Sequence, residues 1–211
     1  MRLAALLLVL AGAACGPYDD QPPPVPTAGS ARPAAVLPFR VAGFLDPAGG
    51  FVDDTSVGEI PENLGVEIAE RLATDLERAG VHVVPAAVVL RAAPVAGAAL
   101  YDAKLAARVA REVGADFAVM GAVHRYVQRV GSALSVERPA TVDYQAMIVA
   151  ADSGRVIGSY LFDFTQKPLA EDLTTLPDFL QGGGKWRTRE EILYRSLTKT
   201  AAKIASALRS R

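Results

Sequence analysis

Cysteine and histidine are scarce in this chain of 211 residues, which holds one cysteine, Cys15, and two histidines, His82 and His124. A single cysteine cannot form an intramolecular disulfide, and it falls short of the ligand set that a structural zinc site needs. The sequence also lacks the Gly-x-Ser-x-Gly turn that presents a hydrolase nucleophile. Both histidines fall in segments predicted as strands, where a hydrogen-bonded structural role is expected. We therefore predict no catalytic residue, no metal site and no cofactor.

Neither an excess of charge nor a long apolar run is present. Lys and Arg number 22 against 23 Asp and Glu, so the formal net charge is −1. Nucleic-acid binding calls for a concentrated basic face, so no nucleic-acid partner is predicted. The apolar run Leu3–Leu10 is far shorter than the roughly 20 residues that span a bilayer as a helix. A transmembrane helix is therefore not predicted there.

What the chain does have is an export signal that ends at its cysteine. Arg2 provides the positive start, Leu3–Leu10 the apolar region, and the small residues Ala11–Ala14 the cleavage site. This layout is typical of a bacterial lipoprotein signal peptide, residues 1–14, cut before Cys15 and followed by lipidation (palmitate) of its sulfur. Gly12 stands where such signals usually carry leucine, so an ordinary secretory signal ending near Ala14 is the alternative. The following Gly16-Pro17 favours the outer membrane over inner-membrane retention.

Three segments follow from this composition. After the signal, residues 15–32 contain Pro22, Pro23, Pro24 and Pro26, and such a stretch forms an extended spacer. Residues 33–211 are long enough for one domain with a real core. We predict a single, periplasm-facing domain held to the outer membrane by the lipid on Cys15.

The hydrophobic periodicity of that domain predicts an α/β fold. A mixed five-stranded sheet with helices packed on it is expected, in the order strand-helix-strand-helix-strand, β-hairpin, C-terminal helix. The strands are Ala34–Phe39, Val81–Val84, Asp116–Val130, Val142–Ala150 and Val156–Phe164. The helices include Leu64–Leu76 before Gly80, one from Asp102 with Leu105, Val109 and Val113 on its stripe, and one capped by Thr188 and Glu191. On the long strand we expect one face to carry Phe117, Val119, Val123 and Val127.

Aromatic residues gather on the hairpin and around the irregular segment Lys167–Lys185. Tyr160, Phe162 and Phe164 alternate on one strand opposite Tyr144, as expected for core beneath a helix. Phe179 and Trp186 flank the irregular segment. They either pack it down or form a partner-binding patch, because exposed aromatics are favoured interface anchors.

Several of these segments resemble a recurring bacterial envelope domain. They are A-A-V-L-P-F from Ala34, the helix ending at Gly80 with V-H-V-V-P after it, the run Leu105–Val123, and D-S-G-R-V-I-G from Asp152. The pattern is similar to the CsgG-like and TolB amino-terminal-like superfamily, which includes the lipoprotein activator of peptidoglycan synthase. It covers roughly residues 33–165, and residues 166–186 depart from it. The small residues of the glycine-ended motif from Ala115 to Gly121 are expected to let a helix sit close on the strand.

The resemblance implies a non-enzymatic, periplasm-facing protein that acts by binding other proteins or by assembling into rings. The leading hypothesis is an accessory lipoprotein that binds an envelope or periplasmic protein, with a homo-oligomer as a further option. Two alternatives stay open. One is a subunit of an outer-membrane secretion channel, and the other is a hydrolase or ligand-binding enzyme assembled from distant residues.

Overall fold

The computed structural model describes residues 32–53, 60–61, 63–93, 102–131, 136–166 and 186–210. The predicted signal peptide, Cys15, the proline-rich spacer and Phe179 lie outside these residues. Within them, none of the helices is both long enough and apolar enough to cross a membrane.

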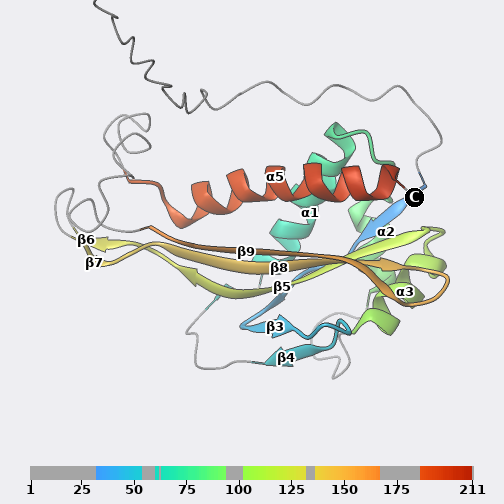
Figure 1. Ribbon diagram of the computed structural model, residues 1–211, viewed down its shortest axis with the longest axis horizontal. Helices are drawn as coiled ribbons and strands as arrows, with labels where there is room; N and C mark the ends of the chain where they lie inside the picture. The colour runs from blue at the N-terminus through green and yellow to red at the C-terminus, as the bar shows by residue number, and fades with distance from the viewer. Residues whose placement is uncertain are drawn as a thin grey trace, which may run out of the picture.

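A mixed sheet of five strands forms the centre of the domain (Figure 1). Its strands run in the order β1-β5-β8-β9, and β2 also pairs with β5. β1 and β2 lie parallel to β5, whereas β5, β8 and β9 are antiparallel to their neighbours. The bounds are β1 Ala34–Val36, β2 Arg40–Val41, β5 Phe117–Val127, β8 Thr141–Ala150 and β9 Val156–Thr165. The predicted α/β class with a mixed five-stranded sheet is confirmed.

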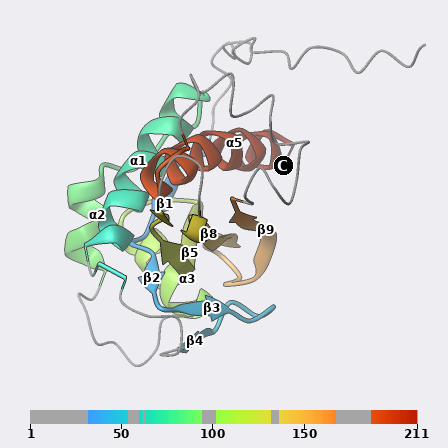
Figure 2. The same cartoon turned by 90° about the vertical axis from the view of Figure 1, so that its left-hand side faces the viewer.

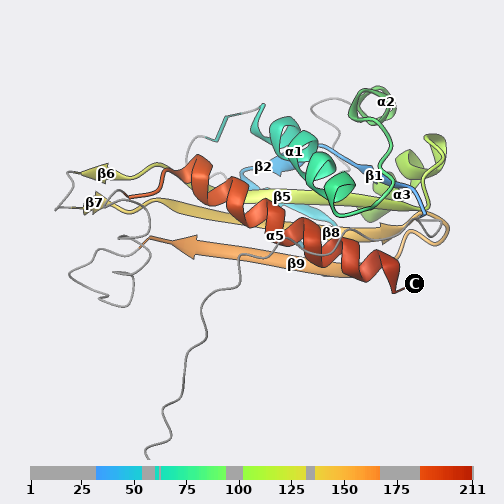
Figure 3. The same ribbon diagram turned by 90° about the horizontal axis from the view of Figure 1, so that it is seen from above.

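Helices cover the two faces of this sheet unequally. One face lies beneath α1 (Leu64–Arg78) and α5 (Arg189–Arg209), with α5 running along β8 and β9 (Figure 3). The opposite face meets α3 (Ala103–Glu112) and the ribbon of β3 (Gly43–Leu45) and β4 (Phe51–Asp53), as Figure 2 shows. The helix α2 (Ala86–Ala92) packs beside α3, and a small ribbon of β6 (Val130–Gly131) and β7 (Val136–Arg138) extends one end.

The sheet therefore separates two hydrophobic cores. Beneath α1 and α5, large side chains fill the core, among them Leu72, Tyr144 and Leu197. The core under α3 is built largely from small residues, because the buried face of α3 is Ala103, Ala106, Ala107, Val109 and Ala110. The predicted stripe of Leu105, Val109 and Val113 faces this core, with Val109 fully buried and the other two partly buried against it. Alanines allow α3 to approach the sheet closely.

Local signals placed most element ends correctly. Asp102 caps α3 by accepting a hydrogen bond from the Leu105 N–H at 2.8 Å. Thr188 and Glu191 form the predicted capping box at the start of α5. The hairpin turns at Gly154, whose φ of +67° is easily adopted only by glycine.

The predicted strand Val81–Val84 is the main difference. It is reduced to a single parallel bridge between Val83 and Ala34. Hydrogen bonds run from the Ala34 N–H to the His82 carbonyl and from the Val84 N–H to the Ala34 carbonyl, both at 2.9 Å. The next N–H that could face β1 belongs to Ala86, but α2 begins at Ala86, so the ladder ends there. The fifth strand is instead β2.

A β-bulge in β5 changes which side chains reach the core. The register between β5 and β8 shifts between Val123 and Arg125. Phe117, Val119 and Val123 face the α1–α5 core as predicted, but Tyr126, not Val127, continues that face. An extra residue at a bulge reverses the alternation beyond it. His124 and Arg125 consequently both approach the opposite face of the sheet.

Candidate protein-binding surface

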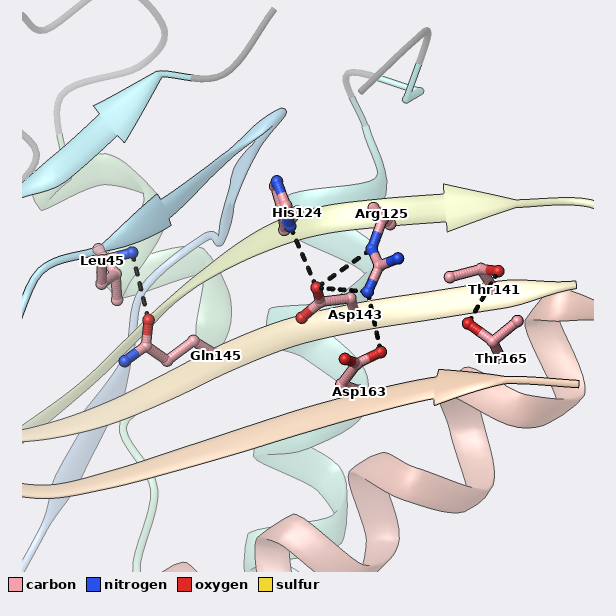
Figure 4. A network of polar contacts seen from close by, with 8 residues as sticks. All are labelled: Leu45, His124, Arg125, Thr141, Asp143, Gln145, Asp163 and Thr165. Atoms are coloured by element: carbon pink, nitrogen blue, oxygen red, sulfur yellow. Dashed lines mark hydrogen bonds and ion pairs between the residues drawn. The ribbon is translucent and has the colours of Figure 1, made fainter. Parts of the chain in front are cut away.

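The sheet face opposite α1 and α5 is divided into an apolar and a polar half. Met120, Met147 and Val149 lie in the core beneath α3. Further along the same face, polar side chains of β5, β8 and β9 lie side by side and make three groups of contacts; Figure 4 shows all of them except Ser159, together with Leu45. We call this set the polar layer; it consists of His124, Arg125, Thr141, Asp143, Gln145, Ser159, Asp163 and Thr165.

Asp143 is the centre of the polar layer. Its Oδ2 lies 3.1 Å from Nδ1 of His124 and accepts hydrogen bonds from Arg125 Nε at 3.3 Å and Nη2 at 3.2 Å. Arg125 Nη2 also donates to Asp163 Oδ1 at 2.9 Å. Asp143 is buried, whereas Asp163 is 55% exposed at its side chain. Arg125 is thus held between two carboxylates, one of which still faces solvent.

Further polar contacts join β8 to β9 and to the β3–β4 ribbon. Gln145 accepts a hydrogen bond from the Leu45 N–H at 3.2 Å and donates from Nε2 to Ser159 Oγ at 3.1 Å. The hydroxyls of Thr141 and Thr165 lie 3.3 Å apart. Gln145 therefore fixes β3 against the sheet beside the charged groups.

Exposed apolar residues border the polar layer; we call them the apolar rim. Phe44 and Val52 face each other across the β3–β4 ribbon and are 44% and 41% exposed. The Phe44 ring meets His124 edge-on, with 6.2 Å between ring centroids. Leu161, opposite Gln145 on β9, is 73% exposed. Exposed apolar side chains that lie beside charged groups fixed by ion pairs are typical of a protein-binding surface.

Only one of the two histidines has the structural role that the sequence predicted. His124 is hydrogen-bonded to Asp143, as expected for a structural histidine. His82 is exposed, and its backbone carbonyl, not its ring, carries the contact to Ala34. Among the described residues, no cluster of three or more His, Cys, Asp or Glu side chains could hold a metal ion.

Trp186, one half of the predicted aromatic patch, lies at the start of α5. It is half-buried, and the Arg129 guanidinium lies 5.3 Å from the centre of its ring. Next to it, Arg189 covers the ring of Tyr126 at 4.3 Å. Burial, and then the charge of Glu190, raises the pKa of Tyr126. Half-burial suits both earlier interpretations of Trp186, packing and partner binding, so its role stays a prediction.

A second surface feature lies between α1 and α5. A shallow groove of about 380 Å³ is lined by Glu67, Glu70, Arg71, Thr74 and Tyr194. Arg71 lies 5.3 Å from the centre of the Tyr194 ring and also binds Asp75, so the charged side chain that borders this groove is already held by internal contacts.

Sequence analysis missed the polar layer and the apolar rim. The bulge that brings His124 and Arg125 to Asp143 has no local signal in the sequence. Leu161 did have one. Because Tyr160, Phe162 and Phe164 were assigned to the core face, Leu161 had to be an apolar residue on the opposite face.

No family model and no curated protein matches the chain. Among solved structures, it is similar to the PelC dodecamer from Paraburkholderia phytofirmans, with 16% identity, a TM-score of 0.46, and 89% of this chain and 94% of that one covered. It is similar to lipoprotein GNA1162 from Neisseria meningitidis, with 18% identity, a TM-score of 0.42, and 72% and 95% covered. Hypothetical protein CT253 from Chlamydia trachomatis gives 14% identity, a TM-score of 0.48, and 86% and 100% covered. These neighbours thus include a bacterial lipoprotein, but TM-scores below 0.5 assign neither a family nor a function.

Proposed function

We propose that this protein is an outer-membrane lipoprotein, anchored through Cys15, whose periplasm-facing domain binds an envelope protein in an accessory or assembly role without catalysing a reaction. The observation that carries the binding role is the polar layer with Phe44 and Val52 exposed beside it. The proposed outer-membrane location rests on the signal peptide and on Cys15. The proposed non-enzymatic role rests on the scarcity of catalytic groups in the sequence.

The geometry favours binding because the charges are already ordered. Arg125 is held by Asp143 and Asp163, so little side-chain entropy is lost when a partner covers them. The exposed carboxylate of Asp163 has lone pairs left for a donor. A partner with an apolar group for Phe44 and a basic side chain for Asp163 complements this surface.

Cross-linking in the native envelope, followed by identification of the captured protein, tests this proposal. Phe44→Ser should abolish capture, whereas Tyr194→Ser, which alters an exposed aromatic residue on α5, should leave it unchanged. Trp186→Ser examines the rival aromatic patch. Capture lost with Trp186→Ser but kept with Phe44→Ser would move the binding surface to the start of α5, and no captured envelope protein at all would overturn the proposal.

A further inference from the structure

We propose that two copies of this chain pair in antiparallel fashion through the outer edge of β9, with Leu161 facing Leu161 of the second copy on the two-fold axis. This inference goes beyond the proposed function, because it rests on the backbone edge of β9 and on Leu161 of the apolar rim, whereas the proposed capture depends on Phe44. It would give one continuous sheet across the dimer.

The edge of β9 lacks the features that normally prevent pairing. Within the described part of the chain, β9 pairs with β8 and with no other strand. It has ten residues and contains no Lys, Arg or Pro, the residues that commonly protect sheet edges. Its single charged residue, Asp163, is bound by Arg125. A long edge without protection is a template for another strand.

The hydrogen-bond pattern shows which groups point outward. The Gln166 N–H donates to the Ala140 carbonyl at 2.9 Å, and the register from Thr141–Thr165 to Ile148–Gly158 is continuous. In antiparallel pairs, hydrogen-bonded positions recur at every second residue. Tyr160, Phe162 and Phe164 therefore bond to β8. The N–H and C=O groups of Ser159, Leu161 and Asp163 point away from the sheet.

Leu161 lies at the middle of these outward positions. With 73% of its surface accessible, it is the most exposed of the large apolar side chains in the described residues. A second Leu161 beside it would shield both side chains on the same face of the extended sheet, and burial of apolar surface is favourable.

The residue pairs around this axis are complementary. Ser159 would face Asp163 of the second copy, and Tyr160 would face its Phe162, an aromatic pair that stabilises antiparallel strands. Phe164, which is 37% exposed, would lie over Gly158 of the second copy, as aromatic rings do over glycines in neighbouring strands.

Neighbouring registers are poorer. An axis at Asp163 would place two carboxylates directly opposite each other, which is destabilising. An axis at Ser159 would leave Asp163, Phe164 and Thr165 without facing residues in β9 of the second copy. Axes at Tyr160 and at Phe162 would place Leu161 opposite Ser159 and opposite Asp163. Only the axis at Leu161 brings the two leucines together, which is why we assign the edge to self-association in that register.

Cysteine cross-linking tests the register in the full chain carrying Cys15→Ser, which has no other thiol. Facing Cα atoms of a hydrogen-bonded pair lie about 5.5 Å apart, within the range that a disulfide bridges. Leu161→Cys should therefore give a disulfide-linked dimer on mild oxidation. Ser159→Cys is the matched control on the same face, because its two copies would lie about 14 Å apart along the strands. Equal cross-linking of both variants, or none of Leu161→Cys, would overturn the register.

Charge substitution tests the dimer itself. In sedimentation velocity the wild-type chain should be a dimer, and Leu161→Lys and Leu161→Glu should each be monomeric, because like charges would meet on the axis. Mixing these two variants should restore a dimer. Circular dichroism checks that each variant is folded. A wild-type monomer at every concentration, or a disulfide from Leu161→Cys to a different envelope protein, would overturn the proposal. Phe44→Ser should leave the dimer intact, so this result is independent of the proposed function.

Discussion

Phe39 is the residue at which α1, β5 and β8 meet. Its N–H donates to the Gly65 carbonyl of α1 at 3.0 Å, and its ring lies 6.4 Å from the ring of Tyr144. A Cβ atom at Gly65 would overlap the Phe39 carbonyl, and one at Gly121 would overlap the Phe39 ring. The small residues of the motif Ala115–Gly121 were expected to let a helix sit close on the strand. Ala115 and Ala118 do lie in the core beneath α3. Gly121 instead leaves room for Phe39, and Gly65 provides the close approach of α1.

Gly121→Ala should destabilise the domain by about 2–3 kcal/mol, because the added methyl group must displace a buried aromatic ring. The midpoint of urea denaturation measures this loss. Gly114→Ala is the control, since the described residues leave open space there and only its φ of +73° opposes alanine, a cost of about 1 kcal/mol. Adding Phe39→Leu should recover part of the loss, and equal losses at the two glycines would contradict this account.

Two buried tyrosines give the domain an alkaline limit. Burial raises the pKa of Tyr144, although hydrogen bonds from Ser196 and Thr200 act in the opposite direction. Tyr126 is shifted in the same direction by burial and by Glu190. The unfolded chain ionises its tyrosines near pH 10, while the folded chain keeps these two neutral to higher pH. The free energy of unfolding is therefore unaffected by them below that pH and falls as the pH rises above it.

Urea denaturation from about pH 8 to about pH 11, a range that brackets the ordinary pKa of tyrosine, measures this decrease in the free energy of unfolding. Tyr144→Phe should be less stable at neutral pH by about 1 kcal/mol, because the Thr200 hydroxyl loses a partner at 2.8 Å. The free energy of unfolding of Tyr144→Phe should nevertheless decline less steeply above pH 10. Tyr126→Phe should show the same shallower decline. An unchanged slope in both variants would show that other groups set the alkaline limit.

At the scale of elements, α1 and α5 are joined through one buried carboxylate. Asp75 is 4% exposed and accepts hydrogen bonds from Arg71 Nε at 3.1 Å, Arg78 Nη1 at 3.0 Å and Thr198 Oγ1 of α5 at 2.9 Å. Asp75 lies on the side of α1 that faces α5. That side is buried because α5 packs against it. The buried carboxylate is tolerated there because side chains of both α1 and α5 donate hydrogen bonds to it.

Asp75→Ala should lower the free energy of unfolding by about 2 kcal/mol, because it leaves the Thr198 hydroxyl and two guanidinium groups without this acceptor. Thermal and urea denaturation measure it. Glu77→Ala, an exposed position on the same helix, should change stability by less than about 0.5 kcal/mol. A double-mutant cycle with Thr198→Val isolates the contact between the helices, and additive effects would show that Asp75 acts within α1 alone.

At the scale of the whole molecule, the domain depends on packing for its stability. The chain has no second cysteine for a disulfide, and two hydrophobic cores lie on opposite faces of one sheet. The core beneath α1 and α5 spans every major strand. Among the hairpin aromatics, Tyr144 is buried in this core, and Tyr160 and Phe162 pack against it, with the tilted rings of Tyr144 and Phe162 5.3 Å apart. The predicted core role is confirmed for these three, whereas Phe164 is exposed and lies outside this core.

Cys15→Ser should abolish the incorporation of labelled fatty acid and release the protein from the membrane fraction, because no other residue offers a thiol for lipidation. Metabolic labelling followed by fractionation of the envelope measures both effects. Gly12→Leu, which restores the usual residue of such signals, should keep the label. Failure of the wild-type chain to take up label would favour an ordinary secretory signal ending near Ala14.

Elements that depend on neighbours in sequence were predictable. Periodicity located α1, α3 and α5, and the N-caps Asp102 and Thr188 and the turn glycine Gly154 marked where elements begin and turn. These are local effects, since a cap or a turn is satisfied by backbone groups a few residues away. The export signal is read in the same local way.

Only the tertiary structure decided which side chains meet. The bulge at His124 depends on how β5 aligns with β8, so the polar layer of residues from β5, β8 and β9 has no signature along the chain. The burial of Asp75 depends on α5, more than a hundred residues away, and the exposure of Leu161 depends on where the helices stop covering the sheet. The sequence by itself thus determined the local elements and predicted the location in the cell envelope. Contacts between distant segments determined the surface, because their free energy exists only once the chain has brought those segments together.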